Sequence, residues 1–250
     1  MNANAVPVSL TLKGLTPTAQ KQVRQQGYLD IARITLDQIT DKRIDCQTID
    51  FQNVSALINI NDPREPYRTA VVTLDNNIYA LRPSINQLLH QLSDVFPEDY
   101  VHLKHDVCPV LGIHKLAPYI CGDFWLLPMT ELDGHNRSWL RWLHDDHDLA
   151  FDNQTMTVAH WRGVPQLWPL SQKRFDKRRH HGSLVARYHL ALVSQLVPAG
   201  EPEDQLDVAA LTQTMTARQI AQLNRKYGLA VDPATAVRAL QVDRKDRLSA

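Results

Sequence analysis

Short apolar runs bounded by turn-forming residues recur along the chain and predict a core of antiparallel β-sheet. They predict strands at residues 6–12, 55–60, 69–74, 78–81, 107–113, 119–121, 124–127, 148–151 and 155–158. Asp75-Asn76-Asn77 and Asp152-Asn153-Gln154 each join two of these runs as a hairpin, because Asn and Asp tolerate left-handed dihedrals. Residues 124–127 are apolar at every position, which indicates a strand buried on both faces. In 107–113, Pro109 indicates an edge position.

Helical periodicity appears between and after these runs. Pro17 and Gly27 bracket a first helix, as a proline in the first turn and a glycine stop. Residues 83–93 place four apolar residues on one helical face, namely Ile85, Leu88, Leu89 and Leu92. From the N-cap candidate Ser171 onward, a further stripe predicts a long helical segment, with Gly182 as a candidate division into two helices. This stripe consists of Phe175, Leu184, Tyr188, Leu192 and Leu196.

We therefore expect an α+β fold, with a mainly antiparallel sheet core, packed helices and a small C-terminal helical extension. Residues 198–207 hold two prolines, one glycine and four acids, which is typical of a linker. The predicted organisation is a mixed α+β core over 1–197, this acidic linker, and a helical extension over 208–250.

Composition narrows the class of protein. An apolar fraction of 44% over 250 residues is that of an ordinary globular protein, and no run of about 18 apolar residues predicts a membrane span. The first residues lack the charged and apolar regions of a secretory signal. Cys46, Cys108 and Cys121 stand at unrelated spacings, which indicates buried thiols rather than a disulfide framework. We expect a cytoplasmic protein.

The positive charge of the chain is concentrated in one segment. Residues 1–170 carry 14 Lys and Arg against 19 Asp and Glu, whereas residues 171–200 carry six against one. The last fifty residues balance, with seven of each sign. A local surplus of this kind is the usual electrostatic footprint of an anionic partner.

Two polar segments resemble metal sites. His144 to Asp148 hold three carboxylates and two imidazoles, but neighbouring residues on an extended chain point to opposite faces, which favours a solvated turn. Residues 133–136, Asp-Gly-His-Asn, resemble the hairpin of small metal-binding nucleases, although a polar turn explains them as well. The chain has no Gly-rich phosphate loop, nucleophile elbow or His-Glu-x-x-His motif. We expect no enzyme activity, no bound metal and no cofactor.

The basic segment is the more specific signal. Helical spacing places Arg174, Lys177, Arg178 and His181 on one face, where a row of charges would meet phosphates with salt-dependent affinity. A solvated charged helix face is the alternative interpretation.

Residues 115–158 hold, in order, a strand that begins Lys-Leu-Ala-Pro, an apolar strand that ends in Leu-Pro, a strand that contains Trp139 and a hairpin with an Asp-Asn turn. This order resembles the family of the competence transcription factor ComK. The family's strands match Lys115-Leu116-Ala117-Pro118-Tyr119-Ile120 and Phe124-Trp125-Leu126-Leu127-Pro128. The later matches are Asn136-Arg137-Ser138-Trp139-Leu140 and the hairpin at 151–158. The resemblance covers roughly residues 55–195, but the family's Ser-Ser and Gly-Arg segment is absent, and residues 200–250 extend beyond it.

The resemblance implies a sequence-specific activator of DNA-uptake genes, which establishes competence by binding A-rich and T-rich boxes in double-stranded DNA as a homo-oligomer. It also implies a proteolytic adaptor as a partner. Narrow A-tract grooves attract inserted arginines, and the candidates by charge and position are Arg137, Arg141, Arg178 and Arg179. The candidate phosphate anchors are Lys173, Arg174, Lys177 and Arg187.

Three hypotheses follow from the sequence. The first is a ComK-like DNA-binding regulator. The second is a metal-dependent nuclease or phosphohydrolase that uses His135, His144, Asp146 and His147. The third is a protein-interaction adaptor whose helices at 211–243 recruit a partner.

Overall fold

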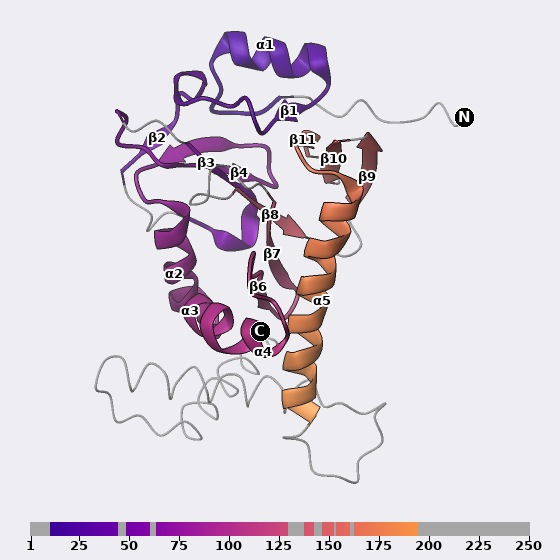
Figure 1. Cartoon of the computed structure of the whole chain (residues 1–250). Coiled ribbons are helices and arrows are strands. Elements are labelled where there is room, and N and C mark those ends of the chain that lie inside the picture. Colours follow the sequence, from indigo (N-terminus) through magenta and orange to yellow (C-terminus); the bar gives the residue numbers. More distant parts are fainter. Residues whose placement is uncertain are drawn as a thin grey trace, which may run out of the picture. The chain divides into compact units, whose positions relative to one another are not determined.

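The computed structural model describes residues 11–44, 49–60, 64–129, 138–142, 147–152, 154–160 and 163–194 (Figure 1). Internal contacts divide the chain into two units, Met1–Ser93 with Glu98–Ala186 and Asp94–Pro97 with Arg187–Ala250. The predicted linker at 198–207 and the predicted helices after it lie outside the described residues. The elements below belong to the first unit, except for the ends of α2 and α5.

The larger sheet has seven strands in the order β2-β5-β4-β3-β8-β7-β6. All neighbours pair antiparallel except β2 and β5, which pair in parallel. The strands are β2 Lys42–Arg43, β3 Val54–Asn59, β4 Thr69–Thr73, β5 Ile78–Leu81, β6 Tyr119–Cys121, β7 Phe124–Pro128 and β8 Trp139–Trp142.

The smaller sheet has four strands in the order β1-β11-β10-β9. Its members are β1 Leu29–Asp30, β9 His147–Asp152, β10 Thr155–His160 and β11 Gln166–Trp168. β9 and β10 form the hairpin that the Asp152-Asn153-Gln154 turn predicts, and β1 closes the sheet in parallel with β11.

The helices are α1 Pro17–Gln26, α2 Ile85–Val95, α3 Tyr100–His102, the π-helix η3 Leu103–Val107, α4 Cys108–Val110 and α5 Gln172–Ser194, with 3₁₀ turns η1 Leu36–Gln38 and η2 Phe51–Asn53. The predicted ends of α1 are confirmed. Thr16 caps its first turn by accepting from the Ala19 amide, and Gly27 ends it at φ 80°. The predicted face of α2 is also confirmed, because its four apolar residues are buried.

Burial on both faces of the larger sheet follows from its apolar strands. Every residue of β4, β5, β7 and β8 is buried, which confirms the prediction for residues 124–127. Cys108 and Cys121 are buried free thiols, as predicted, and burial raises the pKa of Cys108 to about 11 and that of Cys121 to about 12. The mixed α+β architecture, with two mostly antiparallel sheets, confirms the predicted fold class.

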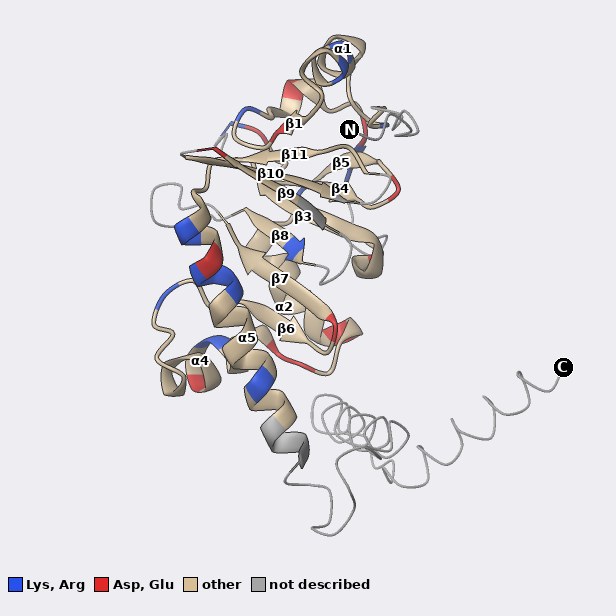
Figure 2. Cartoon of the chain, turned by 90° about the vertical axis from the view of Figure 1, so that its right-hand side faces the viewer, with Lys and Arg blue, Asp and Glu red and all other residues tan. Residues whose placement is uncertain are grey.

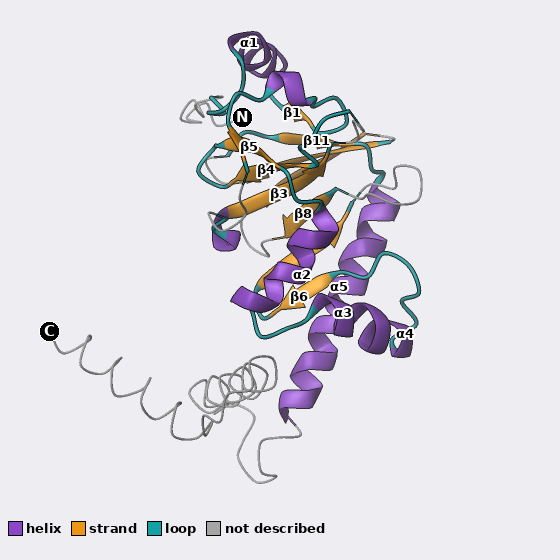
Figure 3. Ribbon diagram, turned by 90° about the vertical axis from the view of Figure 1, so that its left-hand side faces the viewer, coloured by secondary structure: helices purple, strands orange, loops and turns teal. Residues whose placement is uncertain are grey.

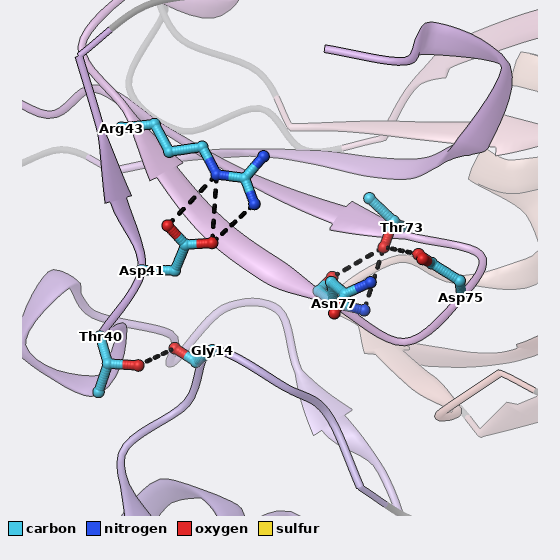
Figure 4. Close-up of polar contacts among 7 residues, drawn as sticks. All are labelled: Gly14, Thr40, Asp41, Arg43, Thr73, Asp75 and Asn77. Carbon is cyan, nitrogen blue, oxygen red and sulfur yellow. Dashed lines mark hydrogen bonds and ion pairs between the residues drawn. The ribbon is translucent and has the colours of Figure 1, made fainter. Parts of the chain in front are cut away.

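The turn between β4 and β5 also ties the two sheets together. Asn76 adopts φ 61°, the left-handed conformation that the sequence predicts for this turn. Thr73 Oγ1 accepts from the Asn77 amide at 3.0 Å and donates to Asp75 (Figure 4). Asn76 Oδ1 accepts from the Val164 amide at 2.8 Å, just before β11. Nearby, Gln166 Nε2 in β11 donates to Ser55 Oγ in β3 at 3.0 Å, a second buried link between the sheets.

The segment before α1 is fixed against the edge of the larger sheet. Gly14 O accepts from Thr40 Oγ1 (Figure 4). A Cβ at Gly14 would lie 2.0 Å from the Ile78 carbonyl oxygen. At the same edge, Arg43 Nη2 meets Asp41 at 2.7 Å, and its guanidinium lies 3.8 Å from the ring centroid of Tyr79. Glycine is required at residue 14 because both its φ of 92° and the close carbonyl exclude a side chain.

Two predicted features are wrong. Residues 107–113 form no strand: they continue from η3 into α4, and Pro109 lies within the first two residues of α4. Gly182 does not divide the C-terminal segment, because α5 runs unbroken from Gln172 to Ser194. The glycine instead gives the helix room against β7, since a Cβ there would lie 2.8 Å from the ring of Trp125.

Candidate nucleic-acid interface

One side of the first half of α5 packs on the sheets. Phe175, Arg178, Gly182 and Val185 are buried and follow one another at spacings of three or four residues, which places them on one helical face. The Phe175 ring meets the Trp142 ring of β8 edge to face at 5.2 Å and lies 6.0 Å from the Phe151 ring of β9. Of the predicted apolar stripe, Phe175 is buried, whereas Leu184 and Tyr188 are half-buried.

The exposed surface of the same turns is basic: at 3.6 residues per turn, Lys173 and Lys177 lie opposite the packed side, while Arg174 and Arg179 border it on its two edges. Its cationic residues are Lys173, Arg174, Lys177 and Arg179, accompanied by exposed His180. Figure 2 shows these Lys and Arg bands on the first turns of α5, interrupted by one acidic band. The acid is Asp176, whose carboxylate lies 3.5 Å from Arg179 Nη2. Because Asp176 offsets one charge, the row presents a surplus of about three positive charges to solvent.

His181 shows how dense the positive charge is along this helix. Burial lowers its pKa, and the nearby cations Lys177, Arg178 and His180 lower it further. The side chain is half-buried, and its Nδ1 has no hydrogen-bond partner among the residues that the structure describes. The imidazole therefore resists becoming a further cation between the exposed row and the sheet.

Arg178 does not belong to the exposed row. Its side chain is 6% exposed and lies on the packed side with Phe175 and Gly182. The prediction that Arg174, Lys177, Arg178 and His181 form one solvent-facing row is therefore corrected. Arg178 is a basic residue on the surface of α5 that packs against the sheets, and this packing buries its side chain.

Arg141 is likewise a buried residue of β8, 8% exposed. Its Nη1 donates to the Gln52 carbonyl oxygen, and its guanidinium lies 5.0 Å from the ring centroid of Phe124. Burial lowers its pKa, against an opposing effect of the Asp50 carboxylate. These contacts make Arg141 a structural residue, which corrects its assignment to a DNA groove.

The remaining predicted residues are placed as follows. Arg179 is exposed, as is Arg187 farther along α5, and Arg137 lies outside the described residues. His135, His144 and Asp146 of the metal-dependent alternative also lie outside them, and His147 begins β9. Within the described ranges, no group of three or more His, Cys, Asp or Glu side chains could hold a metal ion.

A second group of cations was not predicted. Lys104, His105, His114 and Lys115 line one pocket, although the sequence separates the two pairs. The signal was the repeated neighbouring Lys and His on either side of Cys108-Pro109. A strand over residues 107–113, as the sequence predicts, would hold the two pairs apart, whereas the helical turns of α4 and the residues after it bring them to one pocket.

Comparison of the chain with protein-family models, curated proteins and solved structures finds no match. Among the helices that the structure describes, none combines the length and hydropathy needed to cross a bilayer.

Proposed function

We propose that this protein binds double-stranded DNA through the exposed basic row of α5 and acts as a transcriptional regulator of the ComK type. The observation that carries the proposal is the two-sided character of α5. One side is anchored by Phe175, Gly182 and Val185, while Lys173, Arg174, Lys177 and Arg179 face solvent from the same rigid helix. A row held in this way meets phosphates without first having to be ordered.

The dimensions of the row suit a DNA backbone. From Lys173 to Arg179 the helix rises about 9 Å, while each strand of a duplex carries one phosphate per about 3.4 Å of its axis. Along the helix axis the row therefore covers the length of about two or three phosphates, while its side chains fan out around the helix. Lys173, Arg174 and Lys177 serve as phosphate anchors, and Arg179 is the remaining candidate for insertion into a narrow groove.

Activation of competence genes, paired A-rich and T-rich boxes and a homo-oligomer are the parts of this proposal that come from the resemblance. Resemblance and charge agree on the partner, because the polar segment that follows the family's hairpin is here the basic row. Arg187 extends the same helix and is the next candidate contact.

The test is fluorescence anisotropy with an A/T-box duplex, titrated between about 50 and 200 mM salt. For Lys173→Gln/Lys177→Gln we expect weaker binding and a plot of log affinity against log salt that is shallower by about two, since one counterion is released per phosphate contact. The matched control is Lys13→Gln/Lys21→Gln, which removes two exposed lysines outside α5 and should leave both quantities unchanged.

A wild-type slope in Lys173→Gln/Lys177→Gln would contradict the proposed interface. Equal affinity for a G/C-rich duplex of the same length would contradict recognition of A/T-rich boxes, while leaving non-specific DNA binding in place.

A further inference from the structure

A pocket of about 450 Å³ is lined by α2, the α3–η3–α4 segment, strand β8 and the turn that precedes β6. Figure 3 shows α2, α3 and α4 together with β6 on one side of the chain. The volume lies within the range of about 300 to 1,000 Å³ that is typical of small-molecule sites. Its lining includes the buried side chains of Tyr100, Ile113 and Trp139, which form the base, and the exposed side chains of Lys104, His114 and Lys115, which form the edge.

The base of the pocket is apolar and aromatic. The rings of Tyr100 and Trp139 meet edge to face, with centroids 5.7 Å apart and planes at 81°. Ile113 and Leu116 are 2% and 5% exposed, so the surrounding side chains are held by packing. Such a base suits the flat or apolar part of an organic molecule.

The edge of the pocket is cationic. Lys104, His105, His114 and Lys115 are exposed, and the Asn86 side chain adds an amide. No Asp or Glu occurs among the lining residues that the structure describes. The two ammonium groups at this opening attract a negative charge and disfavour a cation, and the two imidazoles add hydrogen-bonding groups beside them.

Two backbone irregularities shape the pocket. Lys104 and His105 lie in the π-helix η3, an arrangement that is rare and concentrated at functional sites. Leu116 adopts φ 62°, which is strained for a leucine, while its side chain remains buried. Both are rare backbone conformations, and such conformations cluster at functional sites.

We propose that this pocket binds a small organic anion, whose apolar or aromatic body rests on Tyr100 and Trp139 and whose carboxylate or phosphate meets Lys104 and Lys115. The inference goes beyond DNA binding and does not depend on it, because none of the pocket residues belongs to the basic row of α5. A macromolecular phosphate backbone would use the cations at the edge but would leave the enclosed aromatic base empty.

The test uses two fluorescent probes with the same aromatic body. Anilinonaphthalene sulfonate carries an anionic group, and phenylnaphthylamine lacks it. We expect the full-length protein to bind one equivalent of the sulfonate more tightly than the neutral probe. Lys104→Gln/Lys115→Gln should weaken the sulfonate roughly tenfold and leave the neutral probe unchanged, because partly exposed ion pairs are individually weak.

The control is again Lys13→Gln/Lys21→Gln, with the same change in net charge and no pocket residue. All four substituted lysines are exposed, so circular dichroism should show wild-type folding in both variants. Equal sulfonate affinity in wild type and Lys104→Gln/Lys115→Gln would overturn the proposal, as would an equal loss in the control. Loss of duplex-DNA affinity in Lys104→Gln/Lys115→Gln, without loss of the sulfonate, would assign the cations to DNA instead.

Competition separates the two sources of negative charge. A fatty or aromatic carboxylate and an organic phosphate of similar size should each displace the sulfonate. The one that binds more tightly shows whether the pocket prefers a carboxylate or a phosphate group. Failure of both to displace it would also overturn the proposal.

Discussion

Replacement of Gly182 by alanine tests whether α5 is held against β7 as the structure shows. The added Cβ would lie 2.8 and 2.9 Å from two ring carbons of Trp125 and 3.3 Å from Leu127 Cδ2. Trp125 is 5% exposed and its indole Nε1 donates to the Gly122 carbonyl oxygen at 3.0 Å, so the ring cannot simply swing away. The helix or the strand must therefore move by several tenths of an ångström.

Two opposing effects set the magnitude. Alanine in place of glycine within a helix stabilises by about 1 kcal/mol, whereas overpacking a core costs about 1 to 3 kcal/mol. We expect overpacking to prevail, with a net loss of roughly 1 kcal/mol in the free energy of unfolding. Ala186→Gly, one turn further along α5, measures the glycine–alanine difference in the same helix and should cost about 0.5 to 1 kcal/mol.

The assay is urea unfolding followed by tryptophan fluorescence, with the midpoint and slope compared between variants. In a Trp125→Phe background the benzo ring that obstructs the Cβ is gone, so Gly182→Ala should become neutral or stabilising. A stabilisation of about 1 kcal/mol by Gly182→Ala in the wild-type background would refute the close packing of α5 on Trp125.

Two further predictions concern other sites. Gly14→Ala would place a Cβ 2.0 Å from the Ile78 carbonyl oxygen at φ 92°, so we expect a loss of at least about 3 kcal/mol or failure to fold, measured by urea unfolding. The control is Gly112→Ala, at φ 74°, where no described atom lies within 4 Å of the added Cβ, so only about 1 kcal/mol of backbone strain is expected. An equal loss of stability in Gly14→Ala and Gly112→Ala would contradict the close contact between Gly14 and the Ile78 carbonyl oxygen. The pKa of His181 is lowered in the folded protein, so the unfolded chain takes up a proton near pH 6.5 whereas the folded chain does not. The neutral His181 therefore contributes to stability above that pH. This contribution is lost as the pH falls through the folded pKa. His181→Gln should therefore lose less stability than wild type between about pH 8 and 5, and an identical pH dependence in urea unfolding would show that the imidazole is not held neutral.

Local signals in the sequence were sufficient for many individual elements. The Asp75-Asn76-Asn77 turn, the apolar run at 124–127 and the Pro17 and Gly27 boundaries each act within a few residues, so periodicity and turn chemistry predicted them. The basic segment on a helix was also predictable, because charge and helical period are both local properties.

Local signals do not show which segment each face of a helix or strand packs against. Arg178 sits among cations in sequence, yet it is buried because Phe175 and Gly182 turn that side of α5 toward β7 and β8. The sequence predicts a helix break at Gly182 because the close approach of this glycine to Trp125 leaves no trace in the local sequence pattern. The helical character of residues 107–113 was missed for the same reason, since apolar burial within a short segment fits either a strand or a helix.

The sequence by itself determined the α+β class, most strands and helices, and the concentration of positive charge after residue 170. Only the tertiary structure decided which of those charges face solvent, and only it brings Lys104 and Lys115 around a pocket with Trp139 at its base. The physical reason is that exposure and convergence depend on packing between segments far apart in the chain. Helix and strand propensity and the hydrophobic period of a segment are local properties, so they do not show which distant segments will pack together.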